Sequence, residues 1–472
     1  MYPSTDLCVR LAPRARAQNP SLFASKMIYT IAAAALALST HHLPINREFE
    51  AWKVTNGKSY ATFEAELEAL KAFESNTQII REHNAKNLSY TLGHNAFSDL
   101  TWEQFKAQHM SELFLNRNPK NARRVFLANP SYTAADSKDW VADGAVTPVK
   151  DQASCGSCWA FSTTGSVEGA YKVAGNPLTS LSEQQLVSCD HNGDQGCNGG
   201  LMDNAFEYIE QNGLTTEEGY PYTSGSGVTG TCKTSSVNPA VTITGFTDVP
   251  AKDEAALKAA IEKQPVSVAI EADRSAFQLY KSGVLDSRTC GTNLDHGVLA
   301  VGYGTDGGKG YYKVKNSWGA SWGESGYVRM VQGKNMCGIA SQASYPTGAK
   351  PYSAAAQAKP AAQVGTNPTH YGDPATGCMS DELEIQIQGI DGDFCTPACS
   401  LTKECPADVP SGVTAAPQCA LQDATDPTKK YCALMCSPSL PIRDQNAADA
   451  QCGATGSCKE AAVGIGLCTY DD

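Results

Sequence analysis

The sequence predicts an α+β protein of several parts, and three observations lead to that prediction. The chain has 472 residues, more than one compact domain usually holds. A helical pattern follows Cys158, whereas strand-like apolar runs precede Tyr303 and Asn316. Cysteines are absent between residues 40 and 132, but seven lie between 133 and 347 and ten between 378 and 468. We therefore expect a helical N-terminal segment, a mixed central domain and a disulfide-rich C-terminal module.

Charge and cysteine content narrow the class of protein. The formal net charge is -12, so nothing in the composition points to nucleic acid or to an anionic membrane surface. The 18 cysteines favour an oxidising compartment, because disulfides persist there.

A targeting segment fits that compartment. "MIYTIAAAALALS", Met27 to Ser39, is an apolar run behind Lys26, and Ala35 and Ala37 suit signal-peptidase cleavage. This run is too short to span a bilayer, and no other stretch approaches about 18 apolar residues. Residues 1–26 resemble neither signal nor fold, so we expect Met27 to be the functional start; a long basic leader to the same signal is the alternative.

Composition shifts divide the chain into five segments. These are a leader with signal peptide (1–39), an N-terminal helical segment (40–134), a central domain (135–347), a Pro/Ala-rich linker (348–374) and a Cys-rich C-terminal domain (375–472).

"DQASCGSCWAF", Asp151 to Phe161, admits four interpretations: a zinc site, a redox dithiol, half of a disulfide, or a nucleophile. A zinc site needs a second C-x-x-C or paired histidines, and the central domain holds only His191 and His296. A redox dithiol of the thioredoxin type needs a βαβ context, whereas here a turn opens directly into a helix.

That helix is expected from about Cys158 to Val173, ending at Gly175. Its buried residues are expected to be Phe161, Val167, Ala170 and Tyr171. Cys158 then lies at a helix N-terminus, where free N–H groups and the macrodipole favour a thiolate. If cysteines pair within their own blocks, the odd number in the central domain leaves one thiol unpaired.

A nucleophilic thiolate needs a base and a group that orients the base. His296 precedes the run Gly297 to Tyr303, and Asn316 ends another strand just before Trp318. A single histidine beside an apolar strand is more often a packed core residue. The joint pattern favours the functional interpretation.

The run Cys155-Gly156-Ser157-Cys158-Trp159, with His296 and Asn316 downstream, resembles papain-like cysteine proteases of the cathepsin L-like subgroup. The resemblance covers Phe49 to about Pro346 in the family's order of motifs. It implies a papain-like two-lobed α+β fold, with a helical lobe that carries Cys158 and a β-barrel lobe that carries His296 and Asn316.

The resemblance also implies catalytic roles. Cys158 would attack the scissile carbonyl, His296 would keep the thiol ionised and protonate the leaving amine, and Asn316 would orient the imidazole. Trp318 would shield that contact from water. Gln152 matches the family's oxyanion-hole glutamine, acting with the Cys158 N–H.

One departure from the family lies beside Gln152, because Ala153 stands where a glycine is usual. The family's disulfide pattern implies Cys155–Cys197, Cys189–Cys232 and Cys290–Cys337. Only Cys158 then stays free, which agrees with the one unpaired thiol expected from the odd number of cysteines.

The family's substrate-binding positions, carried over residue by residue, imply an apolar pocket for the second residue before the cut. They are Gly156, Gly199, Gly200, Leu201, Met202, Ala269, Leu294, Gly297, Trp318 and Gln342. Gln342 at the pocket base is neutral, so we expect a hydrophobic preference without a strong preference for arginine.

The N-terminal segment resembles the inhibitory propeptides of the same subgroup. Its motif residues are Phe73, Asn76, Ile80 and Asn84, followed by Gly93, Asn95, Phe97 and Asp99. The earlier motif positions are replaced by Ala65 and Ala69, so an ordinary amphipathic helix is the alternative for that part. We expect removal near residues 133–137, and Asn87 carries the only N-glycosylation sequon.

The C-terminal module has too little apolar bulk for a sizeable core, so about five disulfides are expected to hold it. It is loop-rich in sequence, has no assigned family and contains no histidine among its cysteines, which argues against a metal site. It is either a stabilising appendage or a binding module of unknown ligand.

Together these features indicate a cysteine endopeptidase made as a zymogen, secreted or lysosomal/vacuolar, monomeric, and without a cofactor. Protein and peptide substrates and its own propeptide would be its partners; no nucleic acid or membrane span is expected. No histidine-rich cleft-blocking insertion is present, which favours endopeptidase over exopeptidase activity. The alternatives are a binding protein on a disabled protease scaffold and a chain that serves mainly as an inhibitor.

Overall fold

The computed structural model describes residues 45–110, 124–127, 134–353, 368–387, 390, 392–400, 402–422, 428–438, 445–462 and 465–470. The expected signal segment lies outside these ranges. The chain divides into two compact units, Met1–Glu74 and Ser75–Asp472, which are taken one at a time. None of the described helices is long and apolar enough to cross a bilayer.

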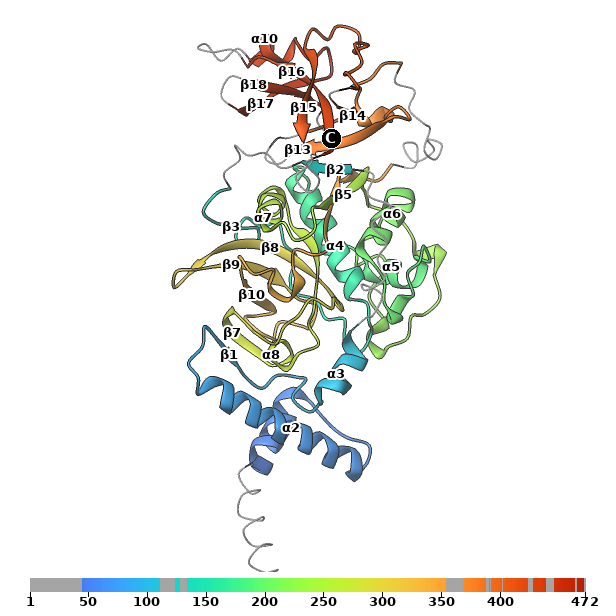
Figure 1. Ribbon diagram of the computed structural model, residues 1–472. Coiled ribbons are helices and arrows are strands. Elements are labelled where there is room, and N and C mark those ends of the chain that lie inside the picture. Colours follow the sequence, from blue (N-terminus) through green and yellow to red (C-terminus); the bar gives the residue numbers. More distant parts are fainter. Residues whose placement is uncertain are drawn as a thin grey trace, which may run out of the picture. The chain divides into compact units, whose positions relative to one another are not determined.

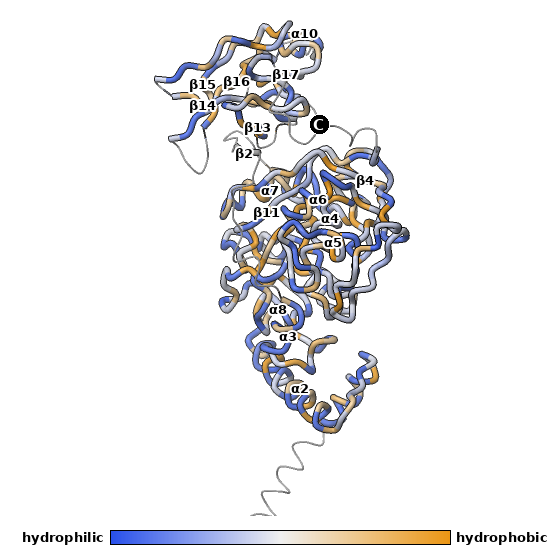
Figure 2. Tube along the Cα trace, turned by 90° about the vertical axis from the view of Figure 1, so that its right-hand side faces the viewer, coloured by the Kyte–Doolittle hydropathy of each residue, from blue (hydrophilic) through white to orange (hydrophobic). Residues whose placement is uncertain are grey.

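The described part of the first unit is helical. Residues 45–56 form a helix, and α2 (Phe63–Asn84) begins after a short turn. Phe49, Trp52, Ala69 and Phe73 form a small aromatic core, in which the Phe49 and Phe73 ring centroids lie 5.3 Å apart. Hydrophobic and hydrophilic residues are interspersed along α2 (Figure 2), and its buried residues recur every three to four positions, as in an amphipathic helix: Ala69, Ala72, Phe73, Asn76 and Ile80.

Three further elements belong to the N-terminal segment: β1 (Tyr90–Leu92), α3 (Trp102–His109) and β2 (Arg124–Leu127). A capping box starts α3, because the Thr101 hydroxyl accepts from the Gln104 N–H and the Gln104 side chain accepts from the Thr101 N–H.

One side of the central domain is helical and holds α4 (Cys158–Val173), α5 (Glu183–Cys189) and α6 (Met202–Asn212). The predicted helix bounds for α4 agree with those observed. Buried apolar residues such as Trp159, Leu186 and Phe206 form one core cluster on this side.

The other side is a nine-stranded sheet with the order β1-β7-β10-β9-β8-β6-β11-β5, and β3 pairs with β8. Its strands from the central domain are β3 (Lys138–Asp139), β5 (Gly245–Val249), β6 (Val266–Ile270), β7 (Tyr280–Leu285), β8 (His296–Asp306), β9 (Lys309–Lys315), β10 (Tyr327–Val331) and β11 (Ala343–Thr347). Helices α7 (Glu254–Lys263) and α8 (Ser275–Gln278) lie between these strands in sequence. A helical side and a β side confirm the predicted papain-like two-lobed fold class.

Helix α4 lies between the sheet and the helices α5 and α6 (Figure 1). Small residues permit its close approach to the sheet: a Cβ on Gly169 would lie 2.4 Å from Pro265, and one on Gly165 would lie 2.8 Å from Leu299. The Ser162 hydroxyl also donates to Val298 O at 2.7 Å. This packing fixes the N-terminus of α4 against the start of β8.

Pairing continues slightly past the predicted end of the central domain. Strand β12 (Lys350–Pro351) pairs with β4 (Val241–Thr242), and the Tyr352 N–H donates to Ala240 O at 2.9 Å. The ordered part of the central domain therefore includes the first residues assigned to the linker from sequence.

The C-terminal module is richer in strands than its sequence indicated. Its elements are β13 (Glu382–Ile387), β14 (Asp393–Cys399), β15 (Ala416–Gln422), β16 (Lys430–Cys436), α10 (Gln445–Asp449), β17 (Ser457–Ala462) and β18 (Ile465–Thr469). Five disulfides join Cys378–Cys395, Cys399–Cys419, Cys405–Cys432, Cys436–Cys458 and Cys452–Cys468. In the described sheet, Cys399–Cys419 joins β14 to β15 and Cys436–Cys458 joins β16 to β17, and neither pair of strands is directly hydrogen-bonded. These two bridges therefore cross-link the sheet beyond its backbone pairing.

Candidate active site

Cys158 is the first residue of α4, is fully buried and is the one described cysteine outside a disulfide. The backbone N–H groups of Trp159 and Gly297 lie near its sulfur and lower its pKa, against the larger effect of burial. Gly297 follows His296 in β8, so the start of this strand lies at the thiol.

His296 begins β8, and Asn316 follows β9, its antiparallel neighbour in the sheet. The Nε2 atom of His296 lies 2.8 Å from Oδ1 of Asn316. An acceptor at Nε2 holds the proton on that nitrogen, so Nδ1 is left as the basic atom of a neutral ring. This is the tautomer that a base facing a thiol requires.

Trp318 covers this pair. Its ring stacks on the His296 ring with centroids 4.7 Å apart and an interplanar angle of 26°. Only 3% of Trp318 is exposed, so the indole excludes water from the His296–Asn316 contact. Exclusion of water strengthens a hydrogen bond because it lowers the local dielectric.

Burial sets the ionisation of the two central groups in this uncut chain. It raises the pKa of the Cys158 thiol to about 12 and lowers the pKa of His296 to about 4, against which the Asn316 hydrogen bond raises it. Both groups are therefore neutral at moderate pH while the site is covered. A thiolate–imidazolium pair needs the site to be uncovered and hydrated.

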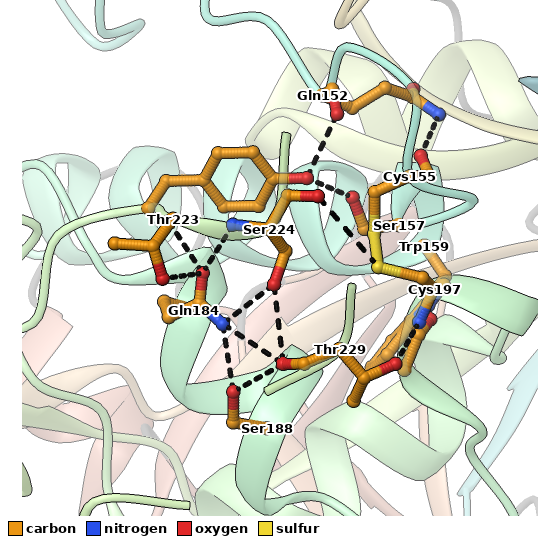
Figure 3. The surroundings of a disulfide bond; sticks show 12 residues. Gln152, Cys155, Ser157, Trp159, Gln184, Ser188, Cys197, Thr223, Ser224 and Thr229 are labelled. Carbon is orange, nitrogen blue, oxygen red and sulfur yellow. Dashed lines mark hydrogen bonds between the residues drawn. A yellow bond between two sulfur atoms is a disulfide. The ribbon is translucent and has the colours of Figure 1, made fainter. Parts of the chain in front are cut away.

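Gln152 is fully buried, and both ends of its side-chain amide are hydrogen-bonded; Figure 3 shows the bond from its nitrogen to Cys155. Its Nε2 donates to Cys155 O at 2.9 Å, and its Oε1 accepts from the Ser317 hydroxyl at 2.7 Å. Ser317 was not identified from sequence, although it lies between two predicted site residues. Because the amide oxygen is fixed as an acceptor, the NH₂ group must face the turn before α4, where an oxyanion would form.

Ala153, which replaces the family's usual glycine, has a φ of +50°. A left-handed conformation costs a residue with a Cβ about 1–2 kcal/mol relative to glycine. Ala153 is nevertheless kept there by its N–H, which donates to Asp151 Oδ1 at 2.9 Å.

We expect Ala153→Gly to stabilise the central domain by about 1 kcal/mol, which would raise Tm by about 2–4 °C. Thermal unfolding is best followed in a Cys158→Ala background, which prevents self-digestion. Ala142→Gly is the matched control, because Ala142 is exposed and is absent from the residues with positive φ. A Tm for Ala153→Gly at or below that of its parent would show that the alanine is not strained.

The expected substrate-binding residues divide into two groups. Leu201, Met202, Ala269 and Leu294 belong to or pack on one apolar cluster. The Gln342 carbonyl oxygen accepts from the Ala269 N–H at 2.9 Å, so its backbone borders the same cluster. These residues therefore lie in or beside one apolar cluster, and their role in substrate binding stays a prediction.

The segment before α6, residues 196–201, is called the binding loop below because substrate-binding residues are expected in it. Close packing requires glycine in this loop and in the turn that it contacts. A Cβ on Gly156 would lie 2.5 Å from Cys197 O, and one on Gly200 would lie 2.5 Å from the Trp159 ring. Gly199 has a φ of +113°. Glycine is therefore required at these positions for the loop to pack against the turn before α4 and against Trp159.

A pair of buried carboxyl groups supports the binding loop, and sequence reasoning missed it. Asp194 Oδ1 accepts from the Leu201 N–H at 2.8 Å and from Asn204 Nδ2 at 3.0 Å. Burial, with the negative charge of the nearby Asp190, raises the pKa of Asp194 to about 9. The sequence signal that could have indicated this pair is the position of Asp190 and Asp194 between Cys189 and Cys197.

The three disulfides implied by the family pattern are present: Cys155–Cys197, Cys189–Cys232 and Cys290–Cys337. Figure 3 shows the first of these within its hydrogen-bond network. Beside it, the Gly156 N–H donates to Cys197 O at 2.9 Å. This disulfide ties the turn before Cys158 to the glycine-rich binding loop.

The N-terminal segment covers this site from the β side. Strand β1 pairs antiparallel with β7, and Asn95 Nδ2 donates to Gln278 O at 2.7 Å. The rings of Phe97 and Phe105 meet Trp318 edge-on, with centroids 5.4 and 5.2 Å away. Phe97 is one of the motif residues singled out from sequence.

Other motif residues order the segment itself. Asn76 Nδ2 donates to the carbonyl oxygens of Ser98 and Leu100, and Asn84 exchanges hydrogen bonds with the backbone of Leu92. Ile80 and Asp99 are buried, whereas the sequon residue Asn87 is exposed. The Gly93 N–H donates to Leu279 O at 2.9 Å.

Two family models match the chain. Residues 134–347 match the papain family of cysteine proteases, and residues 49–105 match the cathepsin propeptide inhibitor domain. The inhibitor match covers the helices and β1 described above, and the protease match covers the two-lobed domain.

Individual proteins agree with these matches. Cysteine protease XCP2 of Arabidopsis thaliana is 44% identical over 74% of this chain and 99% of its own length. Probable cysteine protease RD21B of the same plant is 50% identical over 64% of this chain, and the match spans 66% of its length, just under two thirds.

Among solved structures, a recombinant stem bromelain precursor is 40% identical, with a TM-score of 0.58 over 65% of this chain and 99% of its own. A digestive procathepsin L 3 of Tenebrio molitor is 41% identical, with a TM-score of 0.58 over 64% of this chain and 99% of its own. With its site geometry and these matches, the chain belongs to the papain family of cysteine proteases and carries the family's inhibitory propeptide domain.

Proposed function

We propose that this protein is a cysteine endopeptidase that is made as a zymogen and cleaves peptide bonds through Cys158, His296 and Asn316. The observation that carries the proposal is the hydrogen-bonded His296–Asn316 pair beside a free, helix-terminal Cys158. A disabled protease scaffold, the alternative from sequence, would have no reason to retain all three groups.

In the uncovered enzyme, the Cys158 proton passes to His296 Nδ1, and the thiolate sulfur attacks the scissile carbonyl carbon. The Gln152 amide and the Cys158 N–H stabilise the negative oxygen of the tetrahedral intermediate. His296 then returns its proton to the leaving amine, which yields a thioester. Water, deprotonated by the same imidazole, hydrolyses the thioester and restores the thiol.

Substrate preference follows from the pocket. Leu201, Met202, Ala269 and Leu294 supply apolar walls, which favours an aliphatic or aromatic residue at the second position before the cut. Gln342 adds a neutral polar group, so a formal charge on that substrate residue has no counter-ion from this side chain.

The disulfides of the central domain and the C-terminal module support maturation in the secretory route, with an extracellular or vacuolar destination. The propeptide would leave after a cut near residues 133–137, of which Ala135, Asp136 and Ser137 are exposed.

The test is to express the chain from Met27, incubate it with a thiol at pH about 4–5, and follow its mass and the hydrolysis of a Phe-Arg peptide. The Cys158→Ala chain serves as the control. We expect loss of roughly the first 95–110 residues after the signal, and activity in the wild-type chain alone. A chain with intact disulfides that neither matures nor cleaves would contradict the proposal.

Acid release of the propeptide has a candidate trigger in His94. Burial, with the positive charge of Arg81, lowers the pKa of His94 to about 4, and its Nε2 lies 3.1 Å from the Thr77 hydroxyl. The unfolded segment binds a proton near pH 6.5 and the folded one does not, so folding stability is full above about 6.5 and falls as pH drops toward 4.

We therefore expect His94→Gln to mature several-fold more slowly at pH 5 and to shift the midpoint of maturation to lower pH. The rate of mass change across pH 4–7 measures this. His191→Gln is the matched control, since His191 is exposed in the central domain. An unchanged midpoint for His94→Gln would assign the acid response to other groups.

A further inference from the structure

The C-terminal module is bound by a strand of the N-terminal segment. Strand β2 pairs in parallel with β13, with Arg124 opposite Glu384 and Leu127 opposite Ile387. In the seven-stranded sheet, the order is β17-β18-β16-β14-β13-β2, so β2 is the outermost strand. Within the module itself, β13 is the strand at this edge of the sheet. Among the described strands, only β2 pairs with the outer side of β13.

This pairing joins two parts that lie far apart in the chain, and the residue types suit it. Val125 and Phe126 are strand-favouring residues, and β13 reads Glu-Leu-Glu-Ile-Gln-Ile, with Ile385 and Ile387 buried in the module's core. The β13 edge is therefore held in place by core packing, and an extended segment can add to it by backbone hydrogen bonds.

We propose that the outer edge of β13 is a binding site for propeptide residues Arg124–Leu127, which keeps the propeptide on the enzyme after it has been cut. This inference rests on the proposed function for its consequence, because retention matters only if the covered site is catalytic. It also assigns a role to the C-terminal module, which sequence left open.

The position of the strand relative to the cut carries the argument. Residues 124–127 lie on the propeptide side of the expected cut at 133–137, so cleavage leaves β2 attached to the propeptide fragment. That fragment is then held at two places: β1 on β7 in the catalytic domain, and β2 on β13 in the C-terminal module.

Two attachments to one molecule retain a ligand better than one. When either strand detaches, the other keeps it at a high effective concentration, and such linkage raises apparent affinity by about 10²–10⁴-fold. The cut enzyme would stay inhibited until β2 leaves β13. The outer edge of β13 would then expose unpaired backbone N–H and C=O groups, which can pair with another extended segment.

The test uses the full chain with Cys158→Ala and a recognition site for an unrelated sequence-specific protease inserted between Thr133 and Ser137. After cutting, gel filtration follows the release of the propeptide fragment with time. We expect the double substitution Val125→Pro/Phe126→Pro to speed release at least about tenfold, because proline removes backbone donors from the strand. Asn121→Pro, just outside the paired residues, is the matched control and should behave like the parent.

A second variant is needed in case the double proline substitution prevents folding. It is the same inactive protein shortened to end after Tyr352, so that it lacks β13. The matched stem bromelain precursor shares 99% of its length with only 65% of this chain, so propeptide and catalytic parts fold without a counterpart of the module. Release should be as fast here as in the proline variant. Equal release from parent, proline variant and shortened chain would overturn the proposal.

This readout is binding by an inactive chain, so it is independent of peptidase activity. If the wild-type chain proved inactive in the maturation test, retention by β13 would still be measurable. If release were unaffected while the wild-type enzyme matured and cleaved peptides, only the retention site would be wrong.

Discussion

His296→Ala is expected to lower kcat/KM for a peptide substrate by at least about 10⁴-fold. In the proposed mechanism the imidazole takes the Cys158 proton, protonates the leaving amine and activates water, so its removal would affect both halves of the reaction. In the parent, His296 Nε2 lies 2.8 Å from Asn316 Oδ1, and the Trp318 ring covers the imidazole. We therefore expect no other side chain to replace the imidazole as a base in the variant. The enzyme should be matured through an inserted protease site, because self-processing would fail.

His191→Ala is the matched control. It removes the other histidine of the central domain, which is exposed, and should leave kcat/KM within about twofold. Alkylation of Cys158 by iodoacetamide between pH 4 and 8 adds a readout that a purely structural role would not move. The thiol of the matured His296→Ala enzyme should react only as pH approaches the ordinary pKa of a cysteine, about 8.5, whereas the parent should react in acid. A mature His296→Ala enzyme with near-normal kcat/KM would refute the assigned mechanism.

The central site was largely predictable because its residues lie at element ends that sequence patterns mark. The turn before Cys158 opens directly into an apolar helix, and α4 has the bounds that its periodicity predicted. His296 and Asn316 flank strand-like runs, and β8 and β9 are indeed adjacent and antiparallel. Family resemblance then supplied the roles, which neither periodicity nor spacing gives.

Other features depend on contacts between distant segments, and no local pattern announces them. A serine at position 317 predicts no function from sequence alone. Its hydroxyl holds the site in place only because it lies 2.7 Å from Oε1 of Gln152, a residue 165 positions earlier in the chain. The raised pKa of Asp194 arises from burial beneath the binding loop and from Asp190. The β2–β13 pairing joins residues more than 250 positions apart in sequence.

Gln152→Ala is expected to reduce kcat by about 10²–10³-fold with little change in KM. In the proposed mechanism the amide contributes a hydrogen-bond donor to the oxyanion, which exists in the transition state and not in the bound substrate. Its orientation is fixed by the Ser317 hydroxyl and by Cys155 O, so no reorganisation is needed when the charge forms. Steady-state kinetics of the matured enzyme, with Tm measured in parallel, gives both constants and excludes unfolding.

Gln152→Glu separates the donor from the shape of the side chain. A glutamate can still accept from the Ser317 hydroxyl, but when ionised it offers no donor and adds a negative charge beside the oxyanion. Activity should fall at least as far as in Gln152→Ala at neutral pH and recover partly in acid, where the protonated carboxyl regains a donor. Gln211→Ala, an exposed change on α6, should have no effect. Full activity of Gln152→Glu at neutral pH would mean that Gln152 orders the turn before Cys158 and takes no part in stabilising the oxyanion.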